Sequence, residues 1–158
     1  MAITVGVNSY ISVADADTYF GDRLYADDWS SANSGIKEKS LLMARRWIDM
    51  QDFLGARTDP NQMLAWPRIG IQGVNSTTVP QNVFDAQCEL ALAFVRSDLT
   101  LNDDNRNVRR LREQVGAIVT ETEYDGRAPA HVLPDAVSAL LRPYFAATEN
   151  PNSVAMVL

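Results

Sequence analysis

Arginine is the residue type whose spacing in this chain most clearly points to chemistry. The stretch "NRNVRRLRE" contains Arg106, Arg109, Arg110 and Arg112 against a single acidic residue, Glu113. A guanidinium group binds phosphate or carboxylate through paired hydrogen bonds. Arg106 and Arg109 are therefore candidate contacts for phosphate or for an acidic partner. The alternative is that these arginines are solvated side chains that flank a strand.

Residues that catalyse reactions or bind metals are sparse. His131 is the only histidine and Cys88 the only cysteine, so the chain has too few ligands for a zinc set and cannot form an internal disulfide. The run from Asp103 begins like a calcium loop, but it lacks the glycine, and Gln114 stands where the bidentate glutamate should be. The glycines lack the spacing of a phosphate-binding loop. The sequence therefore predicts no enzyme, no cofactor and no metal site.

The composition indicates a folded, acidic protein. Hydrophobic residues make up 46% of the 158 residues and charged residues 22%, which is the globular range, and the formal net charge is −6. A surface of this sign repels phosphate, so nucleic-acid binding requires a local basic patch. The N-terminus lacks the pattern of a signal peptide, and no apolar stretch approaches the roughly 20 residues of a membrane span. We expect a protein that starts in the cytoplasm and does not contact membranes.

Two of four expected helices lie in the N-terminal third of the chain. The first begins at Ser12, a capping residue with Asp15 three positions later. Phe20 and Leu24 fall on its apolar face. The second helix is expected to start at Ser34 and to end at about residue 51.

The third and fourth helices follow an irregular connection. Trp66 in this connection is expected to pin it to the core. The third helix runs from Pro80 to about residue 99 and is apolar around most of its circumference, which is typical of a central helix. Leu92 falls on its narrow polar line and is expected to be exposed. The fourth helix begins at Pro134, and Pro143 should kink or end it.

A hairpin is expected at about residues 109–124, the one clearly strand-like stretch. Charged and apolar residues alternate imperfectly on its arms, so one face can lie on the helices while an edge stays free for another chain. The predicted fold is mainly α, a four-helix core with one short β-hairpin, in a single helical domain of residues 1–147. The hairpin residues expected at a subunit interface are Arg110, Arg112, Val119, Glu121 and Glu123.

Residues 148–158 are expected to form a C-terminal tail. This segment follows Pro143, and its apolar residues do not have helical spacing. It therefore has little means of packing on its own helix and is expected to dock on a partner. The residues expected to make that contact are Val154, Met156, Val157 and Leu158.

Five segments, taken in order, resemble one known family. They are "YISVADADTYF", "ARRWID", "LAWPR", "VPQNVFDAQCELAL" and "LPDAVSALLRPYF", and they extend over about residues 10–145. Their combination resembles the head-tail connector or adaptor proteins in the virion neck of tailed bacteriophages. Some members carry the label DnaT-like single-stranded DNA-binding protein.

The resemblance implies a structural virion protein without catalysis. Such a protein forms a homo-oligomeric ring, commonly a dodecamer, on the portal protein at the capsid vertex. It joins head to tail through a tail-side neck protein, either a stopper or a tail-completion protein. The hairpin would contact adjacent subunits and the tail would dock on the portal. Genomic double-stranded DNA would pass through the channel without tight binding. The protein itself would be located in the virion neck, at the head-tail interface, and in the host cytoplasm during assembly.

The alternative is a DnaT-like module that binds single-stranded DNA. The label and the arginines of residues 106–112 favour it. Single-strand binders combine a basic groove with exposed stacking aromatics. Here the aromatic residues fall mostly on helix faces that are expected to be buried, apart from Tyr124, and the net charge is −6. The connector is therefore the leading hypothesis from the sequence.

Overall fold

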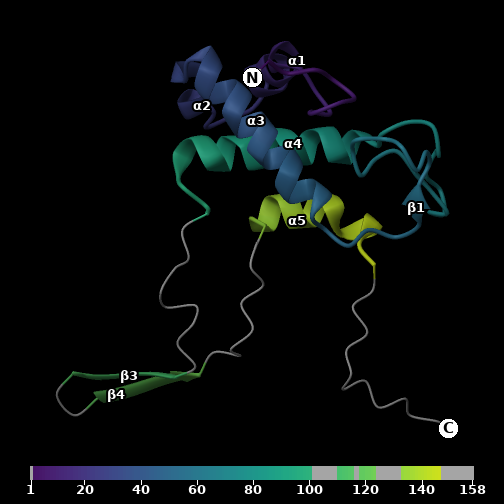
Figure 1. Cartoon of the computed structure of the whole chain (residues 1–158). Coiled ribbons are helices and arrows are strands. Elements are labelled where there is room, and N and C mark those ends of the chain that lie inside the picture. The colour runs from purple at the N-terminus through teal and green to yellow at the C-terminus, as the bar shows by residue number, and fades with distance from the viewer. Residues whose placement is uncertain (1, 101–109, 116–117, 124–132, 147–158) are drawn as a thin grey trace, which may run out of the picture.

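A computed structural model describes residues 2–100, 110–115, 118–123 and 133–146 (Figure 1). The fold is mainly helical with short antiparallel strand pairs, which confirms the predicted fold class. The helices are α1 Val13–Gly21, α2 Asp27–Ser31, α3 Ser34–Asp49, α4 Gln81–Arg96, α5 Asp135–Leu141 and the short 3-10 helix η2 Arg142–Tyr144. The strands are β1 Ala56–Arg57, β2 Arg68–Ile69, β3 Arg110–Val115 and β4 Ile118–Glu123.

Helix α1 begins with the predicted capping box. The Ser12 hydroxyl accepts a hydrogen bond from the Asp15 N–H at 3.1 Å, and the Asp15 carboxylate accepts from the Ser12 N–H at 3.1 Å. The helix ends at Gly21, however, and Leu24 lies beyond it with 78% of its surface exposed. The expectation that Leu24 belongs to the apolar face of α1 is wrong, because the chain turns before the helix can reach it.

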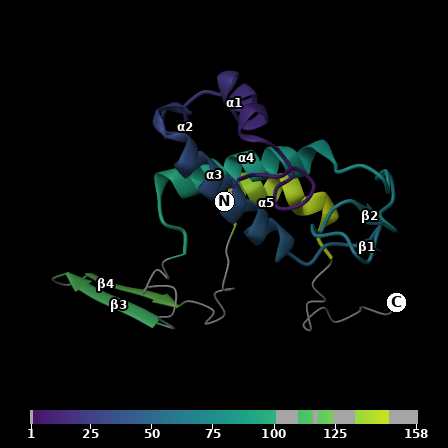
Figure 2. The ribbon, with the colours of Figure 1, turned by 45° about the horizontal axis from the view of Figure 1, so that its top comes forward.

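Helix α4 lies at the centre of the fold, as its sequence predicts. It contacts α3 and α5, and Figures 1 and 2 show these helices stacked on it. Leu92 is 1% exposed, so its predicted exposure is wrong. The reason is α2, which the sequence did not predict: Asp28 of α2 accepts a hydrogen bond from Arg96, one turn beyond Leu92 on the same face of α4.

The end of α5 is fixed against the loop that follows α3. Regular helix stops at Leu141, and the 3-10 turn η2 contains Pro143, as predicted. The Leu54 N–H then donates to the Tyr144 carbonyl at 2.8 Å. Phe145 stacks on Phe53 with ring centroids 5.7 Å apart. These contacts connect the C-terminal end of the described body to the irregular connection between α3 and α4.

That connection contains the β1–β2 ladder, a two-residue strand pair that the sequence did not predict. Gly55 precedes β1 with φ +67°, and a Cβ atom there would lie 2.2 Å from the Ile69 carbonyl oxygen. Only glycine therefore fits this close approach. Trp66 is buried and packs edge-on against Phe53 and Tyr144, with centroids 5.3 and 5.1 Å away. The prediction that Trp66 pins the connection to the core is confirmed.

The β3–β4 hairpin falls within the predicted residues 109–124. Both views show it apart from the helical body (Figures 1 and 2). The prediction of one domain over residues 1–147 and a separate tail stays a prediction. Among the described residues, no helix is both long and apolar enough to cross a membrane.

Candidate functional site

The β3–β4 hairpin contains the residues that the sequence predicts at an interface. Its register places residues of opposite charge across from each other, and such cross-strand neighbours attract. The sequence did not predict this cross-strand placement of residues of opposite charge within one hairpin. The pairs that include the predicted residues are Arg110 and Glu123, Arg112 and Glu121, and Gln114 and Val119.

The remaining predicted site residues lie outside the described part of the chain. Arg106 and Arg109 belong to residues 101–109, directly before β3. The tail residues belong to residues 147–158. Their roles therefore stay predictions. The tail residues concerned are Val154, Met156, Val157 and Leu158.

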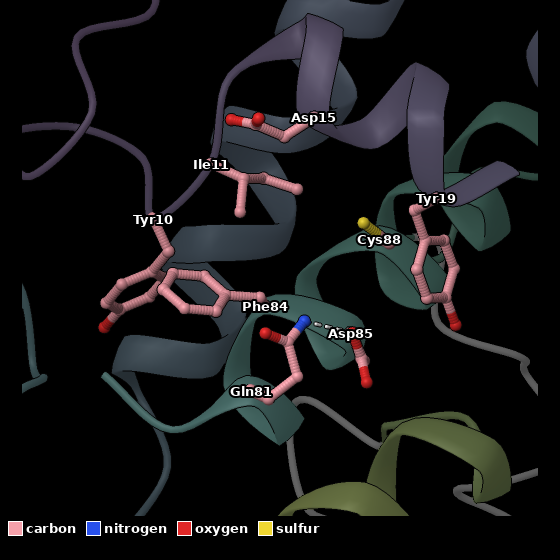
Figure 3. A pocket seen from close by; sticks show the side chains of 8 residues that line it. All are labelled: Tyr10, Ile11, Asp15, Tyr19, Gln81, Phe84, Asp85 and Cys88. Carbon is pink, nitrogen blue, oxygen red and sulfur yellow. Dashed lines mark hydrogen bonds between the residues drawn. The ribbon is translucent and has the colours of Figure 1, made fainter. Parts of the chain in front are cut away.

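A cavity of about 300 Å³ lies between α1 and the first half of α4 (Figure 3). On α4, Gln81 Nε2 donates to Asp85 Oδ1 at 2.9 Å, and Asp15 of α1 lies on the other side of the cavity. We term it the acidic pocket. The side chains that line it are Tyr10, Ile11, Asp15, Tyr19, Gln81, Phe84, Asp85 and Cys88.

Carboxylates determine the electrostatics of the acidic pocket. Burial raises the pKa of the Cys88 thiol, and the negative charges of Asp85, Glu89 and Asp15 raise this pKa further. Arg23 pairs with Glu89, with Nη2 and Oε2 2.8 Å apart. Among the described residues, no cation pairs with Asp15 or Asp85. The pocket therefore repels phosphate, and its thiol stays protonated and unreactive.

A metal ion has no evident place among these carboxylates. Within residues 2–100 and the other described ranges, no group of three or more His, Cys, Asp or Glu side chains could hold one. Asp15 is already occupied as the acceptor of the Ser12 N–H and hydroxyl. The acidic pocket is thus a negatively charged cavity whose carboxylates partly serve to cap a helix and to bind a glutamine amide.

A second cavity of about 230 Å³ has a different lining. It lies where the N-terminal turn, the connection between α3 and α4, and the start of α4 meet. No charged side chain lines it, and we term it the apolar pocket. Tyr10 and Phe84 belong to both pockets. The full lining of the apolar pocket is Val5, Gly6, Tyr10, Gln62, Leu64, Trp66, Pro67, Val79 and Phe84.

Gln87 of α4 holds the backbone at Tyr10. Its side chain is fully buried, and its Oε1 accepts from the Tyr10 N–H at 3.1 Å. Its Nε2 donates to the Ser9 hydroxyl at 2.7 Å and to the Leu41 carbonyl at 2.9 Å. A buried amide with three partners joins the N-terminal segment to α3 and α4. Gln87 therefore sets the position of Tyr10, whose ring lines both pockets.

Asp49 at the end of α3 holds the other end of Tyr10. The Tyr10 hydroxyl donates to Asp49 Oδ1 and accepts from the Trp66 N–H at 3.3 Å. Asp49 also accepts from the Ala65 N–H at 3.3 Å and pairs with Arg45 at 3.3 Å. Burial raises the pKa of Asp49, and the hydrogen bond from Tyr10 acts against this rise in pKa. The network fixes Tyr10 and Trp66, two walls of the apolar pocket.

Many cations of the helical body are already neutralised. Their side chains form ion pairs with carboxylates of other elements or of the next helical turn, so they offer little charge to an external anion. The hairpin's register adds two facing pairs of opposite sign. The ion pairs of the body are Arg23–Glu89, Lys37–Asp17, Arg45–Asp49 and Arg96–Asp28.

Arg57 and Arg68 are among the cations of the described body that form no such ion pair. They are direct partners in the β1–β2 ladder, and neither forms an ion pair with a described carboxylate. Burial lowers the pKa of Arg68, and the charge of Arg57 lowers this pKa further. Sequence reasoning missed this pair because two-residue strands have no readable alternation. A signal did exist in retrospect, since Arg68 follows the "LAWP" segment.

Comparison with known proteins gives one match. Residues 2–158 match the sequence profile of a family described as "Putative DnaT-like ssDNA binding protein". No curated protein matches the chain, and no solved structure does. The match covers the helical body, both pockets and the hairpin, so it concerns the whole molecule.

This finding overturns the leading hypothesis from the sequence. The matched family is one of DNA-binding proteins, neither connectors nor enzymes, and nothing supports a phage head-tail connector. The assignments to a portal protein, a tail-side neck protein, a homo-oligomeric ring and a channel for double-stranded DNA are therefore wrong, as is the description as a virion protein. Over nearly its whole length, this chain belongs to the family described as "Putative DnaT-like ssDNA binding protein".

Proposed function

We propose that this protein binds single-stranded DNA and has no catalytic activity of its own. The observation that carries the proposal is the family match over residues 2–158. Proteins of this kind hold the phosphate backbone with basic groups and stack bases on aromatic side chains. The net charge of −6 means that contact must be local, because the protein as a whole repels the strand.

The phosphate contacts are best assigned to Arg106 and Arg109. They belong to the densest run of arginines in the sequence. In the hairpin register, Arg110 and Arg112 lie opposite Glu123 and Glu121, residues of opposite charge. Arg106 and Arg109 precede that register.

The proposal is tested by fluorescence anisotropy with a labelled oligodeoxythymidine at several salt concentrations. We expect binding that weakens as salt rises, because each phosphate contact releases condensed counterions. For single strands, the slope of log affinity against log salt is about −0.7 per contact, so Arg106→Ala/Arg109→Ala should make it shallower by about 1.4.

A matched control separates phosphate contact from loss of charge. Arg46→Ala/Arg142→Ala also removes two exposed arginines, and among the described residues neither forms an ion pair. We expect its salt slope to equal that of the wild type. Absence of binding at low salt refutes the proposed function, and equal slopes for the two double variants refute the assignment to Arg106 and Arg109.

A further inference from the structure

The apolar pocket has the size and lining for a single ring system. Its volume of about 230 Å³ lies below the roughly 300–1,000 Å³ of pockets that take drug-sized ligands. Three of its walls are the aromatic rings of Tyr10, Trp66 and Phe84. Such walls bind flat, neutral, unsaturated rings by stacking and by exclusion of water. A whole nucleotide is too large for it, but one base is not.

Two arginines that form no ion pair with a described carboxylate lie close to this pocket. The Thr58 N–H donates to the carbonyl of Pro67, a lining residue, at 3.2 Å, and this bond places Arg57 one residue from the pocket wall. Arg57 is exposed, and its cross-strand partner is Arg68. Like charges directly opposite on a strand pair are destabilising unless an anion offsets them. A phosphate group at Arg57 would supply that anion.

The guanidinium of Arg68 is held in place rather than free to follow a ligand. It donates to the backbone carbonyls of Phe53, Leu54, Gly55 and Ala65 at 2.7–3.2 Å. Carbonyl oxygens fix its position but do not cancel its full charge. Arg68 therefore contributes a fixed positive charge beside Arg57, its direct partner in the β1–β2 ladder.

We propose that the apolar pocket receives one base of a bound single strand, with the adjoining phosphate on Arg57. The inference rests on the proposed function and names a subsite for it. The acidic pocket does not suit this ligand, because Asp15 and Asp85 would repel the phosphate that accompanies the base. The subsite binds a base whatever its identity, since every base has a face that can stack.

The first experiment compares an oligodeoxythymidine with an abasic oligomer of the same length and charge. We expect the wild type to prefer the base-bearing strand about fivefold or more, the scale of one stacked base. Val5→Phe places a ring at the pocket, where Val5 is 53% exposed, and should reduce this preference to within about twofold. Val7→Phe is the matched control, since Val7 is 46% exposed and does not line the pocket.

A second measurement locates the base directly. A strand carrying 5-iododeoxyuridine is photo-crosslinked to the full chain, and the attached peptide is mapped by mass spectrometry. We expect attachment at Tyr10, Trp66 or Phe84. Equal affinity for the two strands, or crosslinks confined to other segments, overturns the base subsite while leaving single-strand binding intact. No binding of either strand overturns both proposals.

Discussion

The two pockets share the rings of Tyr10 and Phe84 yet differ in what they can bind. Around the acidic pocket, Asp15 and Asp85 face the cavity without a paired cation among the described residues. Around the apolar pocket, aliphatic and aromatic groups form the walls, and the adjoining β1–β2 ladder carries Arg57 and Arg68. The shared rings supply affinity for any flat or apolar group. The surrounding charges determine which ligand can bind in each pocket.

The difference follows from which elements complete each pocket. Gln81 and Asp85 are four residues apart on α4, so they belong to one polar line on that helix. The acidic pocket is built on this line. The apolar pocket is completed by the irregular connection between α3 and α4, where Trp66 and Pro67 supply apolar walls. A central helix thus offers carboxylates on one side while a loop covers another side with apolar groups.

The largest expected effect comes from removing the buried amide of Gln87, which positions the Tyr10 ring. Gln87→Leu deletes the acceptor for the Tyr10 N–H and the donor to Ser9 and Leu41. Buried groups left without a partner cost about 1–3 kcal/mol each, so we expect a loss of about 3 kcal/mol in the free energy of unfolding. Urea denaturation measures it. DNA affinity should fall together with stability, because the wall of both pockets shifts.

The control for this change is Gln81→Ala. Gln81 is exposed and donates only to Asp85 among the described side chains. Surface changes of this kind usually lie within about 0.5 kcal/mol of the wild type. If Gln87→Leu is equally mild, Tyr10 is held by its ring contacts and not by the buried amide.

A smaller loss is expected for Tyr10→Phe, which keeps the ring and removes the hydroxyl. The buried carboxylate of Asp49 loses a donor and the Trp66 N–H loses an acceptor, at about 1–3 kcal/mol in unfolding free energy. Tyr25→Phe is the control, since Tyr25 is 81% exposed. Equal stability of the two variants contradicts a structural role for the Tyr10 hydroxyl.

The pH dependence of this loss has a definite sign. Burial raises the pKa of Asp49, so its contribution to stability is present at low pH and is lost as pH rises through its folded-state pKa. Removing the Tyr10 hydroxyl raises that pKa further, because the hydrogen bond favoured the charged form. The difference between variant and wild type should therefore be largest above the folded-state pKa and shrink as pH falls through it. Urea denaturation over a series of pH values measures this trend.

The sequence predicts the helices better than the pockets. Capping at Ser12, the proline at residue 80 and the break at Pro143 are local signals, and the structure agrees with them. Leu92 was misplaced because its burial depends on α2, a five-residue helix too short to show periodicity. Local sequence signals therefore predict where helices begin and end. The burial of Leu92 depends on α2, which has no recognisable sequence pattern.

The candidate site was predictable only in part. The arginine run at residues 106–112 is visible in the sequence because its members are neighbours. Arg57 and Arg68 are separated by 10 residues of irregular chain, and only the β1–β2 register makes them partners. Tyr10 and Phe84 come from opposite halves of the body. Sites assembled from distant segments need the tertiary fold, which a single sequence does not supply.

The smallest expected effect is that of Asp85→Asn on DNA affinity. Asparagine keeps an oxygen that can accept from Gln81, so the fold should persist, and the net charge changes only from −6 to −5. If DNA avoids the acidic pocket, the removed charge acts on the strand mainly through solvent, where salt screens it over about 8 Å. We therefore expect anisotropy to give an affinity within about twofold of the wild type, whereas Arg57→Ala should also make the salt slope shallower by about 0.7. A gain of tenfold or more for Asp85→Asn would mean that the strand passes close to this carboxylate. The base would then belong to the acidic pocket, and the distinction between the two pockets would fail.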